Sequence, residues 1–536
     1  MTAIVPLIRI PPFPGSRPRR PCEPGSLPAR RSGTAEVKQV IAMLARERVG
    51  GCYWGSQPQM PAAGYVLVAV KSADTRDRVC KDLRQRQAVY VHDAKVVCDP
   101  WHLVKCAAEV IVDADDELAV VAASVGLPVR CVGEGPYGSV ATQDGLKDAV
   151  ETHVLSIFYT NPFTGERMSA VEALELSAFW RRQIDANRAI SGALGIAAWK
   201  RETVGPLLWA GPGTPRFGSS GTITGNGEQV VIWRSKCSRA AIAKLERKGV
   251  DLVEIEDGFI RSIGLGADCV PPLSVIVDRL GIYFDASRPS DLEVILESGS
   301  FSPDLIAQAK ALRALIVERG ISKYAAGVLP AQARRSSKRS ILVTGQVEDD
   351  RAVLEGGMGL VSNLELLKRV RERAPEAYII YKPHPDVEAG HRRGAIPDNQ
   401  GRELADEVVR DGSISRLIDA VDEVHVNTSL AGFEALLRCK PVTTYGAPFY
   451  AGWGLTTDYG PVPIRRTARR SLDELVAAAL ILYPRYLDPD TGLPCPAEVL
   501  VRRLAEGRGS GGARPLIWLR RLQGRLRRKL ANVANG

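Results

Sequence analysis

Two adjacent carboxylates stand at the end of an apolar β-type run, in the segment Glu256-Asp257-Gly258. Glycine permits a close approach of the backbone, so this segment is predicted to be an exposed loop at a strand end. Of two adjacent carboxyl groups, one can hold its proton while the other stays ionised. That suits a nucleophile with an acid beside it, or a single general base, and Arg261 is near enough to hold an anion. The alternative is a turn with ordinary surface acids.

A histidine stands between two prolines in Lys382-Pro383-His384-Pro385, directly after the apolar run 378–381. The prolines restrict the backbone on both sides of His384. A histidine held in this way is well placed to donate to a phosphate or to a departing nucleotide, and Lys382 adds positive charge. The alternative is a histidine with a structural role only.

Two further segments place polar side chains after apolar runs. Gln346 follows the run 340–343 and could reach substrate hydroxyls, although the acids after it could simply cap the next helix. Ser429 opens a predicted helix whose free N–H groups form an anion site. Glu434 lies farther into that helix, where a carboxylate suits a ribose diol. The alternative here is a plain helix cap with Glu434 at the surface.

The elements that must position these residues are short β-branched runs that alternate with helical stretches. The runs include 65–70, 109–112, 230–233, 252–255, 340–343 and 378–381. Strands followed by helices predict parallel sheets covered on both faces, which is an α/β, Rossmann-like architecture. In such sheets ligands bind at the carboxyl ends of the strands. The candidate residues above all follow runs of this kind.

An internal repeat indicates an incomplete early copy of part of the chain. The stretch 103–112 is similar to 417–426, and 161–165 is similar to 488–492, in the same order. The early copy has no counterpart of the His384 segment, because residues 69–74 stand where 381–386 are expected. We therefore predict that the early copy is catalytically inactive and serves for packing or for contact with a partner.

Composition favours a cytoplasmic protein without a metal site. The ten cysteines form no CxxC pair and the six histidines form no HxxxH pair, so neither a metal site nor a disulfide framework is expected. No apolar run is long enough to span a bilayer. The start of the chain is broken by prolines and is not a good secretory signal.

The two ends of the chain differ from its middle. Residues 1–35 are rich in Pro, Arg and Gly and are predicted to be disordered. Residues 513–536 contain arginines, a lysine and no acid, with leucines at helical spacing beside Trp518. A basic amphipathic helix of this kind is typical of a membrane-surface anchor, and the alternative is a solvated or partner-docked helix. The formal charge of +10 suits anionic partners, but most of the excess positive charge lies in this tail, so nucleic acid is not expected.

Several segments together resemble the capsule polysaccharide biosynthesis proteins that transfer Kdo (3-deoxy-D-manno-octulosonic acid) in Gram-negative bacteria. They are EDGFIRSIGLGAD, GQVEDD, YKPHPDVEAG and TSLAGFEALLRCKPVTTYGAPFYAGWGLTTD, within about residues 175–505. The resemblance implies a GT-B-like fold, in which two Rossmann-type domains face a cleft, here preceded by a degenerate Rossmann-like half-module. The expected domains are a disordered tail (1–35), the half-module (36–175), an acceptor- and sugar-side domain (176–335), a nucleotide-binding domain (336–505) and a basic amphipathic tail (506–536).

The resemblance also implies a retaining glycosyltransferase that uses CMP-Kdo and needs no metal or other cofactor. Asp257, beside Glu256, matches the family's nucleophile of a double displacement, and His384 matches the histidine that binds the CMP phosphate. The further donor-binding residues would be Lys382, Pro385, Gln346, Ser429, Glu434 and Arg261. The acceptor would be a lipid-linked Kdo oligosaccharide of the phosphatidylglycerol type. The protein would act at the inner face of the inner membrane, where a capsule biosynthesis or export complex is a candidate partner.

Two other functions stay open on the residues alone. Nothing in their spacing selects CMP or Kdo, so a GT-B transferase with another sugar nucleotide is one alternative. A non-catalytic scaffold for capsule assembly or export is the other. The usual enzymes of the family carry two full modules that build alternating linkages, whereas only one module is complete here. We therefore expect a single type of linkage.

Overall fold

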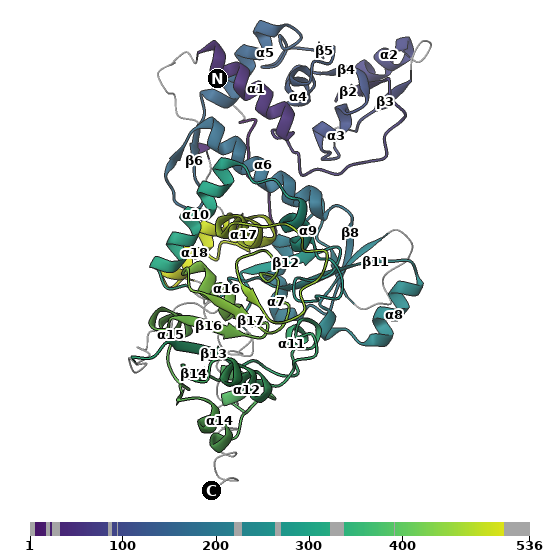
Figure 1. Ribbon diagram of the computed structural model, residues 1–536. Helices are drawn as coiled ribbons and strands as arrows, with labels where there is room; N and C mark the ends of the chain where they lie inside the picture. Colours follow the sequence, from purple (N-terminus) through teal and green to yellow (C-terminus); the bar gives the residue numbers. More distant parts are fainter. Residues whose placement is uncertain are drawn as a thin grey trace. The chain divides into compact units, whose positions relative to one another are not determined.

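The computed structural model describes residues 6–17, 22–23, 33–83, 88–93, 95–218, 228–262, 270–321, 337–390 and 392–508 of the chain. The chain divides into two compact units (Figure 1). The early unit comprises 1–190, 208–215 and 490–493, and the late unit comprises 191–207, 216–489 and 494–536. Both units contain parallel sheets with helices, which confirms the predicted α/β class.

The early unit is built on a four-stranded parallel sheet in the order β3-β2-β4-β5. Its strands are β2 (Tyr65–Ala69), β3 (Val89–Val91), β4 (Ala107–Asp113) and β5 (Val129–Val132). Its helices are α1 (Thr34–Glu47), α2 (Ala73–Leu83), α3 (Pro100–Val104), α4 (Leu118–Ser124), α5 (Gln143–Val150) and α6 (Ala170–Asn187). A second, three-stranded sheet in the order β1-β6-β7 contains β1 (Cys22–Glu23), β6 (Phe158–Thr160) and β7 (Arg167–Met168).

The early unit departs from the sequence prediction at both of its limits. Residues 6–17 are packed, since Leu7 and Phe13 are almost fully buried and the Phe13 ring lies 4.8 Å from that of Trp209. The disorder predicted for 1–35 therefore does not hold for 6–17, and residues 1–5, 18–21 and 24–32 lie outside the described part. The boundary predicted after residue 175 falls inside α6, where buried Arg181 pairs with buried Asp99 at 2.7 Å.

The late unit contains two sheets, of which the first has the order β20-β19-β12-β11-β10-β8-β9. Its strands are β8 (Ile190–Leu194), β9 (Arg216–Phe217), β10 (Gln229–Ile232), β11 (Asp251–Asp257), β12 (Ser274–Asp278), β19 (Pro484–Leu487) and β20 (Pro494–Cys495). Strands β10 and β11 are parallel, whereas β12, β19 and β20 join as an antiparallel edge. The hairpin formed by β19 and β20 thus belongs to the first sheet, and not to the domain predicted over 336–505. The helices are α7 (Ala198–Leu207), α8 (Arg239–Arg247), α9 (Asp291–Ser298), α10 (Pro303–Glu318) and α18 (Ala497–Ala505).

The second sheet of the late unit is parallel throughout, in the order β15-β14-β13-β16-β17-β18. Its strands are β13 (Ser340–Thr344), β14 (Tyr378–Lys382), β15 (Glu407–Val408), β16 (Glu423–Val426), β17 (Val442–Thr444) and β18 (Thr457–Asp458). Its helices are α11 (Arg351–Gly356), α12 (Asn363–Arg373), α13 (Pro385–Glu388), α14 (Asp398–Leu404), α15 (Ile414–Ala420), α16 (Leu430–Leu437) and α17 (Leu472–Val476). Buried Ile341, Val343 and Ile379 pack with Leu366, Leu367 and Val370 of α12.

The order of this sheet determines where a ligand can bind. From β13 the chain adds β14 and β15 on one side and then returns to add β16, β17 and β18 on the other. The loops after β13 and β16 therefore diverge, and this leaves a crevice at the carboxyl ends of the two strands. Gln346, His384 and Ser429 all follow strands that end at this edge.

The topology confirms the internal repeat but changes its alignment. Strand β2 lies between β3 and β4, as β13 lies between β14 and β16, and a π-helical turn, a hairpin and a helix close both copies. Val66 pairs with Val89 and Glu109, while Ile341 pairs with Ile379 and Glu423. Val89 of β3 thus corresponds to Ile379 of β14, so His92, which directly follows β3, corresponds to Lys382. The predicted match of 69–74 to 381–386 is therefore wrong, and Lys71 instead takes the place of Gln346.

Among the described residues, no helix combines the length and the apolar character that a membrane crossing requires. The basic segment 513–536 and the predicted tail beyond residue 508 lie outside the described part of the chain.

Candidate functional site

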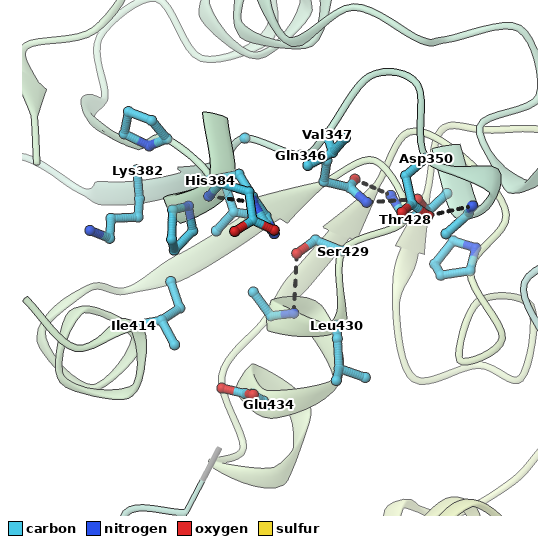
Figure 2. Close-up of a pocket in the computed structure, with 18 of the residues that line it drawn as sticks. Gln346, Val347, Asp350, Lys382, His384, Ile414, Thr428, Ser429, Leu430 and Glu434 are labelled. Carbon is cyan, nitrogen blue, oxygen red and sulfur yellow. Dashed lines mark hydrogen bonds between the residues drawn. The ribbon is translucent and has the colours of Figure 1, made fainter. Parts of the chain in front are cut away.

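A pocket of about 370 Å³ opens at the predicted edge of the second sheet (Figure 2). The loops that follow β13, β14 and β16 line it, and aromatic side chains close it from two other segments. The lining residues that matter below are Tyr283, Phe284, Thr344, Gln346, Asp350, Lys382, His384, Pro385, Thr428, Ser429, Glu434 and Phe449. The pocket thus brings together six of the predicted site residues from three strand ends.

His384 is held by the helix that it starts. It is the N-cap of α13, and its Nδ1 accepts a hydrogen bond from the Asp386 N–H at 3.1 Å. Because Nδ1 acts as an acceptor, the neutral ring carries its proton on Nε2. The ring lines the pocket, so this N–H is a donor suited to an anion there. His384 therefore also has the structural role that the sequence left open, because one of its ring nitrogens caps the helix.

Ser429 starts α16 beside this histidine and caps it by accepting from the Ala431 N–H at 3.3 Å (Figure 2). The first N–H groups of this helix and its dipole favour a negative charge at the same end. Glu434 lies one turn farther along, only 7% exposed, and lines the pocket. The alternative that placed Glu434 at the surface is therefore wrong.

Gln346 connects two of the strand ends. Its side-chain amide donates to Thr428 Oγ1 and its oxygen accepts from the Thr428 N–H, both at 2.9 Å. These bonds use one donor and one acceptor of the amide, so the main observed role of Gln346 is to fix the start of α16 against β13. Asp350 caps α11, as the alternative from the sequence proposed.

Lys382 lines the pocket from the end of β14 and is 7% exposed. Its ammonium group donates to the backbone oxygen of Arg410. Burial lowers the pKa of Lys382, while the charges of Asp411 and Glu388 act in the opposite direction. A bound anion would favour the charged form further.

Asp257 is found at the end of β11, in the first sheet, and is not among the lining residues of the pocket. Its side chain is 19% exposed. One oxygen accepts from Arg261 Nε at 2.7 Å and the other lies 3.3 Å from Lys200 Nζ. The neighbouring Glu256 carboxylate accepts the Asp257 N–H at 3.1 Å. The alternative of ordinary surface acids is therefore wrong for Asp257.

Arg261 has a different place from the one predicted. It is 1% exposed, and besides Asp257 its guanidinium group donates to Ser262 Oγ at 2.8 Å and to the Val270 carbonyl at 2.7 Å. All three nitrogens therefore bind the protein itself. Arg261 orients the carboxylate of Asp257 instead of lining the pocket.

A buried glutamate links the strand of Asp257 to the pocket. Glu254, three residues earlier on β11, is 3% exposed and pairs with Arg234, Arg288 and Arg351. Arg351 is the first residue of α11 and directly follows Asp350, which lines the pocket. Sequence reasoning missed Glu254 and Lys200, because their partners lie far away in the chain and no local pattern marks them.

The early unit carries acids at two positions where the late unit has uncharged residues, one of which, Ser429, lines the pocket. By the strand register, Asp113 takes the place of Asn427 and Asp115 that of Ser429. Lys71 Nζ pairs with Asp115 at 2.8 Å, and the Lys71 N–H donates to Asp113 at 2.7 Å. Carboxylates at this edge oppose the binding of a phosphate. This arrangement supports the prediction that the early copy is inactive.

Comparison with known proteins gives the family. A family model described as "Capsule polysaccharide biosynthesis protein" matches residues 228–486. A solved structure, the "KpsC, beta Kdo 2,4 transferase" of Thermosulfurimonas dismutans, is 32% identical, with a TM-score of 0.52, and the match covers 59% of this chain and 98% of that one. The chain belongs to the Kps-type family of capsule polysaccharide biosynthesis proteins. The two sheets of the late unit are accordingly the two Rossmann-type domains of a GT-B-like fold.

Two curated proteins are also similar to part of the chain. The "Capsule polysaccharide modification protein LipA" of Neisseria meningitidis serogroup A is 40% identical over 354 residues, which are 64% of this chain and 50% of LipA. The "Lipopolysaccharide-processing protein LpsZ" of Rhizobium meliloti is 43% identical over 279 residues, 51% of this chain and 63% of LpsZ. The chain thus spans about half the length of LipA.

Proposed function

We propose that the late unit is a retaining β-Kdo transferase that moves Kdo from CMP-Kdo onto a lipid-linked Kdo oligosaccharide in capsule biosynthesis. The observation that supports this most is that the late unit contains both groups that such a transfer would need. One part is a carboxylate held by two cations, and the other is a pocket built for an anion. The likeness to a β-Kdo 2,4 transferase suggests the sugar.

The nucleotide end of the reaction belongs to the pocket. The phosphate of CMP would lie between His384 and the start of α16, where Nε2–H and helix N–H groups stabilise the charge that develops as CMP leaves. Glu434 and Lys382 both line this pocket, so Glu434 would take the ribose diol and Lys382 would add a positive charge near the phosphate. In this proposal, neither the binding of the nucleotide nor the departure of CMP requires a metal or another cofactor.

The sugar end belongs to Asp257. Its carboxylate attacks the anomeric carbon of Kdo, the bond to the CMP phosphate breaks, and the electron pair leaves with the phosphate oxygen. An acceptor hydroxyl then attacks the same carbon, displaces Asp257 and gives its proton to Glu256. Two displacements at one carbon restore the β configuration.

A transfer assay tests this proposal. Incubation of the full chain with CMP-Kdo and a Kdo-primed, phosphatidylglycerol-type lipid should give a product that is larger by one Kdo, measured by mass spectrometry. Parallel reactions with UDP- and GDP-sugars test the other sugar nucleotides. No product from CMP-Kdo would contradict the proposal, and a product from another donor alone would favour the broader transferase function. No product from any donor would favour a scaffold.

We also propose that the protein works as a peripheral protein at the inner face of the inner membrane, near a capsule biosynthesis or export complex. The basic segment 513–536 would supply the contact, because several Arg and Lys beside Trp518 suit an anionic lipid surface. Removal of 513–536 should abolish sedimentation with phosphatidylglycerol vesicles. Full-length protein that also fails to sediment, or truncated protein that still does, would contradict the anchor.

A further inference from the structure

Lys200 contacts the proposed nucleophile from a helix that lies far from it in the sequence. It belongs to α7, and its Nζ lies 3.3 Å from Asp257 Oδ1. The same Nζ lies 3.2 Å from the centroid of the Trp233 ring, which follows β10. The side chain is only 11% exposed. The face of an aromatic ring attracts a cation, so the indole and the carboxylate together hold the ammonium in one place.

Both carboxylate oxygens of Asp257 are therefore held by cations, and the two contacts differ in length. Arg261 binds Oδ2 at 2.7 Å and is buried among its own partners, whereas Lys200 makes the longer contact to Oδ1. An oxygen that forms a new bond to carbon gives up part of its hydrogen bonding. The attack costs less through Oδ1, whose contact with Lys200 is the weaker one. Oδ2 then stays on Arg261 as the carbonyl oxygen of the ester.

The charges of this cluster change when the ester forms. In the free protein, Lys200 and Arg261 face the carboxylates of Asp257 and Glu256, so positive and negative charges are equal in number. Esterification of Asp257 removes one negative charge and leaves one cation in excess. A buried, unpaired charge is costly. An anionic group on the sugar itself would compensate it, and Kdo carries a carboxylate that is bonded directly to its anomeric carbon.

We infer that Lys200 positions Asp257 for attack and then pairs with the carboxylate of the acidic sugar in the glycosyl-enzyme, an inference that rests on the proposed transferase function. Lys200 would thus select acidic sugars, because a neutral sugar leaves the excess cation without a partner. Burial lowers the pKa of Lys200, and the charges of Asp257 and Glu256 favour its charged form. The nearby charged groups that act on Lys200 are Asp257, Glu256 and Arg261.

The test compares Lys200→Met with Lys200→Arg and with the control Lys244→Met, which removes an exposed lysine of α8. We expect Lys200→Met to lower kcat/KM for CMP-Kdo roughly 100-fold, because it removes a charged group at the reacting centre. The acid limb of its pH profile should move to higher pH, because a carboxylate that loses a cation takes up its proton more readily. Lys200→Arg should recover part of the loss, and CMP affinity should stay unchanged in all three variants. An unchanged kcat/KM and pH profile in Lys200→Met would overturn the inference.

A second measurement does not depend on turnover. The protein is labelled with ¹³C at the carboxyl carbon of aspartate and observed by carbon NMR. The signal of Asp257 is the one that is missing from the spectrum of Asp257→Asn. That signal should titrate at higher pH in Lys200→Met than in wild type, and an equal midpoint would contradict the positioning role. A wild-type protein without transfer activity would refute the proposed function and the pairing with the sugar. The titration would still decide whether Lys200 positions Asp257.

Discussion

Replacement of Asp257 by asparagine should reduce Kdo transfer by about 10⁴-fold or more, because an amide cannot form the glycosyl ester. Asparagine keeps an oxygen for Arg261, so the fold should survive. Alanine would leave two buried cations without their partner and could cost about 3–5 kcal/mol of stability. Asp257 does not line the pocket, so the affinity for CMP, measured by calorimetry, should not change.

The neighbouring carboxylate provides the matched control. Glu256→Gln should lower the rate less than Asp257→Asn, since water can take the acceptor's proton in place of Glu256. Near-normal transfer by Asp257→Asn would remove this residue as the nucleophile. An equal, severe loss in Glu256→Gln would instead support the acid-and-nucleophile pair that the sequence left open. A loss of CMP affinity in Asp257→Asn would mean that the pocket and the acid cluster are not separate.

Replacement of His384 should affect the opposite end of the reaction. His384→Ala removes both the helix cap and the donor to the phosphate. His384→Asn can still accept from the Asp386 N–H through its amide oxygen, but its shorter side chain no longer places a donor where Nε2 stood. A hydrogen bond to a charged group contributes about 1.5–3 kcal/mol. We therefore expect roughly a 10- to 100-fold weaker affinity for CMP in both variants and a large loss of turnover.

The same calorimetric titration gives the number of CMP molecules that bind to each chain. One CMP should bind per wild-type chain, because the acid Asp115 stands in the early unit where the late unit has Ser429. If His384→Asn binds CMP like wild type while His384→Ala does not, then the histidine acts only as a cap. Two CMP molecules per chain would contradict the inactivity of the early unit.

The pocket was predictable because its residues follow strands. An apolar run ends no more than three residues before each of Gln346, Lys382, His384 and Ser429, and the carboxyl ends of parallel strands meet at one edge. No knowledge of the sheet order was needed to expect them together. Whether Glu434 is buried or lies at the surface stayed open in the sequence, because its position on the same helix as Ser429 fits both, and only the structure shows that it is buried.

Other features depend on partners that are distant in the sequence. Lys200 reaches Asp257 across 57 positions, and Glu254 reaches Arg351 across 97. The early copy was misaligned because residues 65–71 and 89–93 are both short apolar runs with a polar end. Only the strand order shows that β3 is the counterpart of β14. The hairpin of β19 and β20 was assigned to the wrong domain, because only the structure shows that β19 pairs with β12 of the first sheet.

The configuration of the new glycosidic bond tests the proposed chemistry most directly. Wild-type protein, CMP-β-Kdo and a Kdo-primed lipid should yield a product whose added Kdo is β-linked, as determined by NMR. Retention requires two displacements at the anomeric carbon, for which Asp257 is the nucleophile that the site offers. An α-linked product would show a single displacement and would contradict the assignment of Asp257 as the residue that bonds to the sugar.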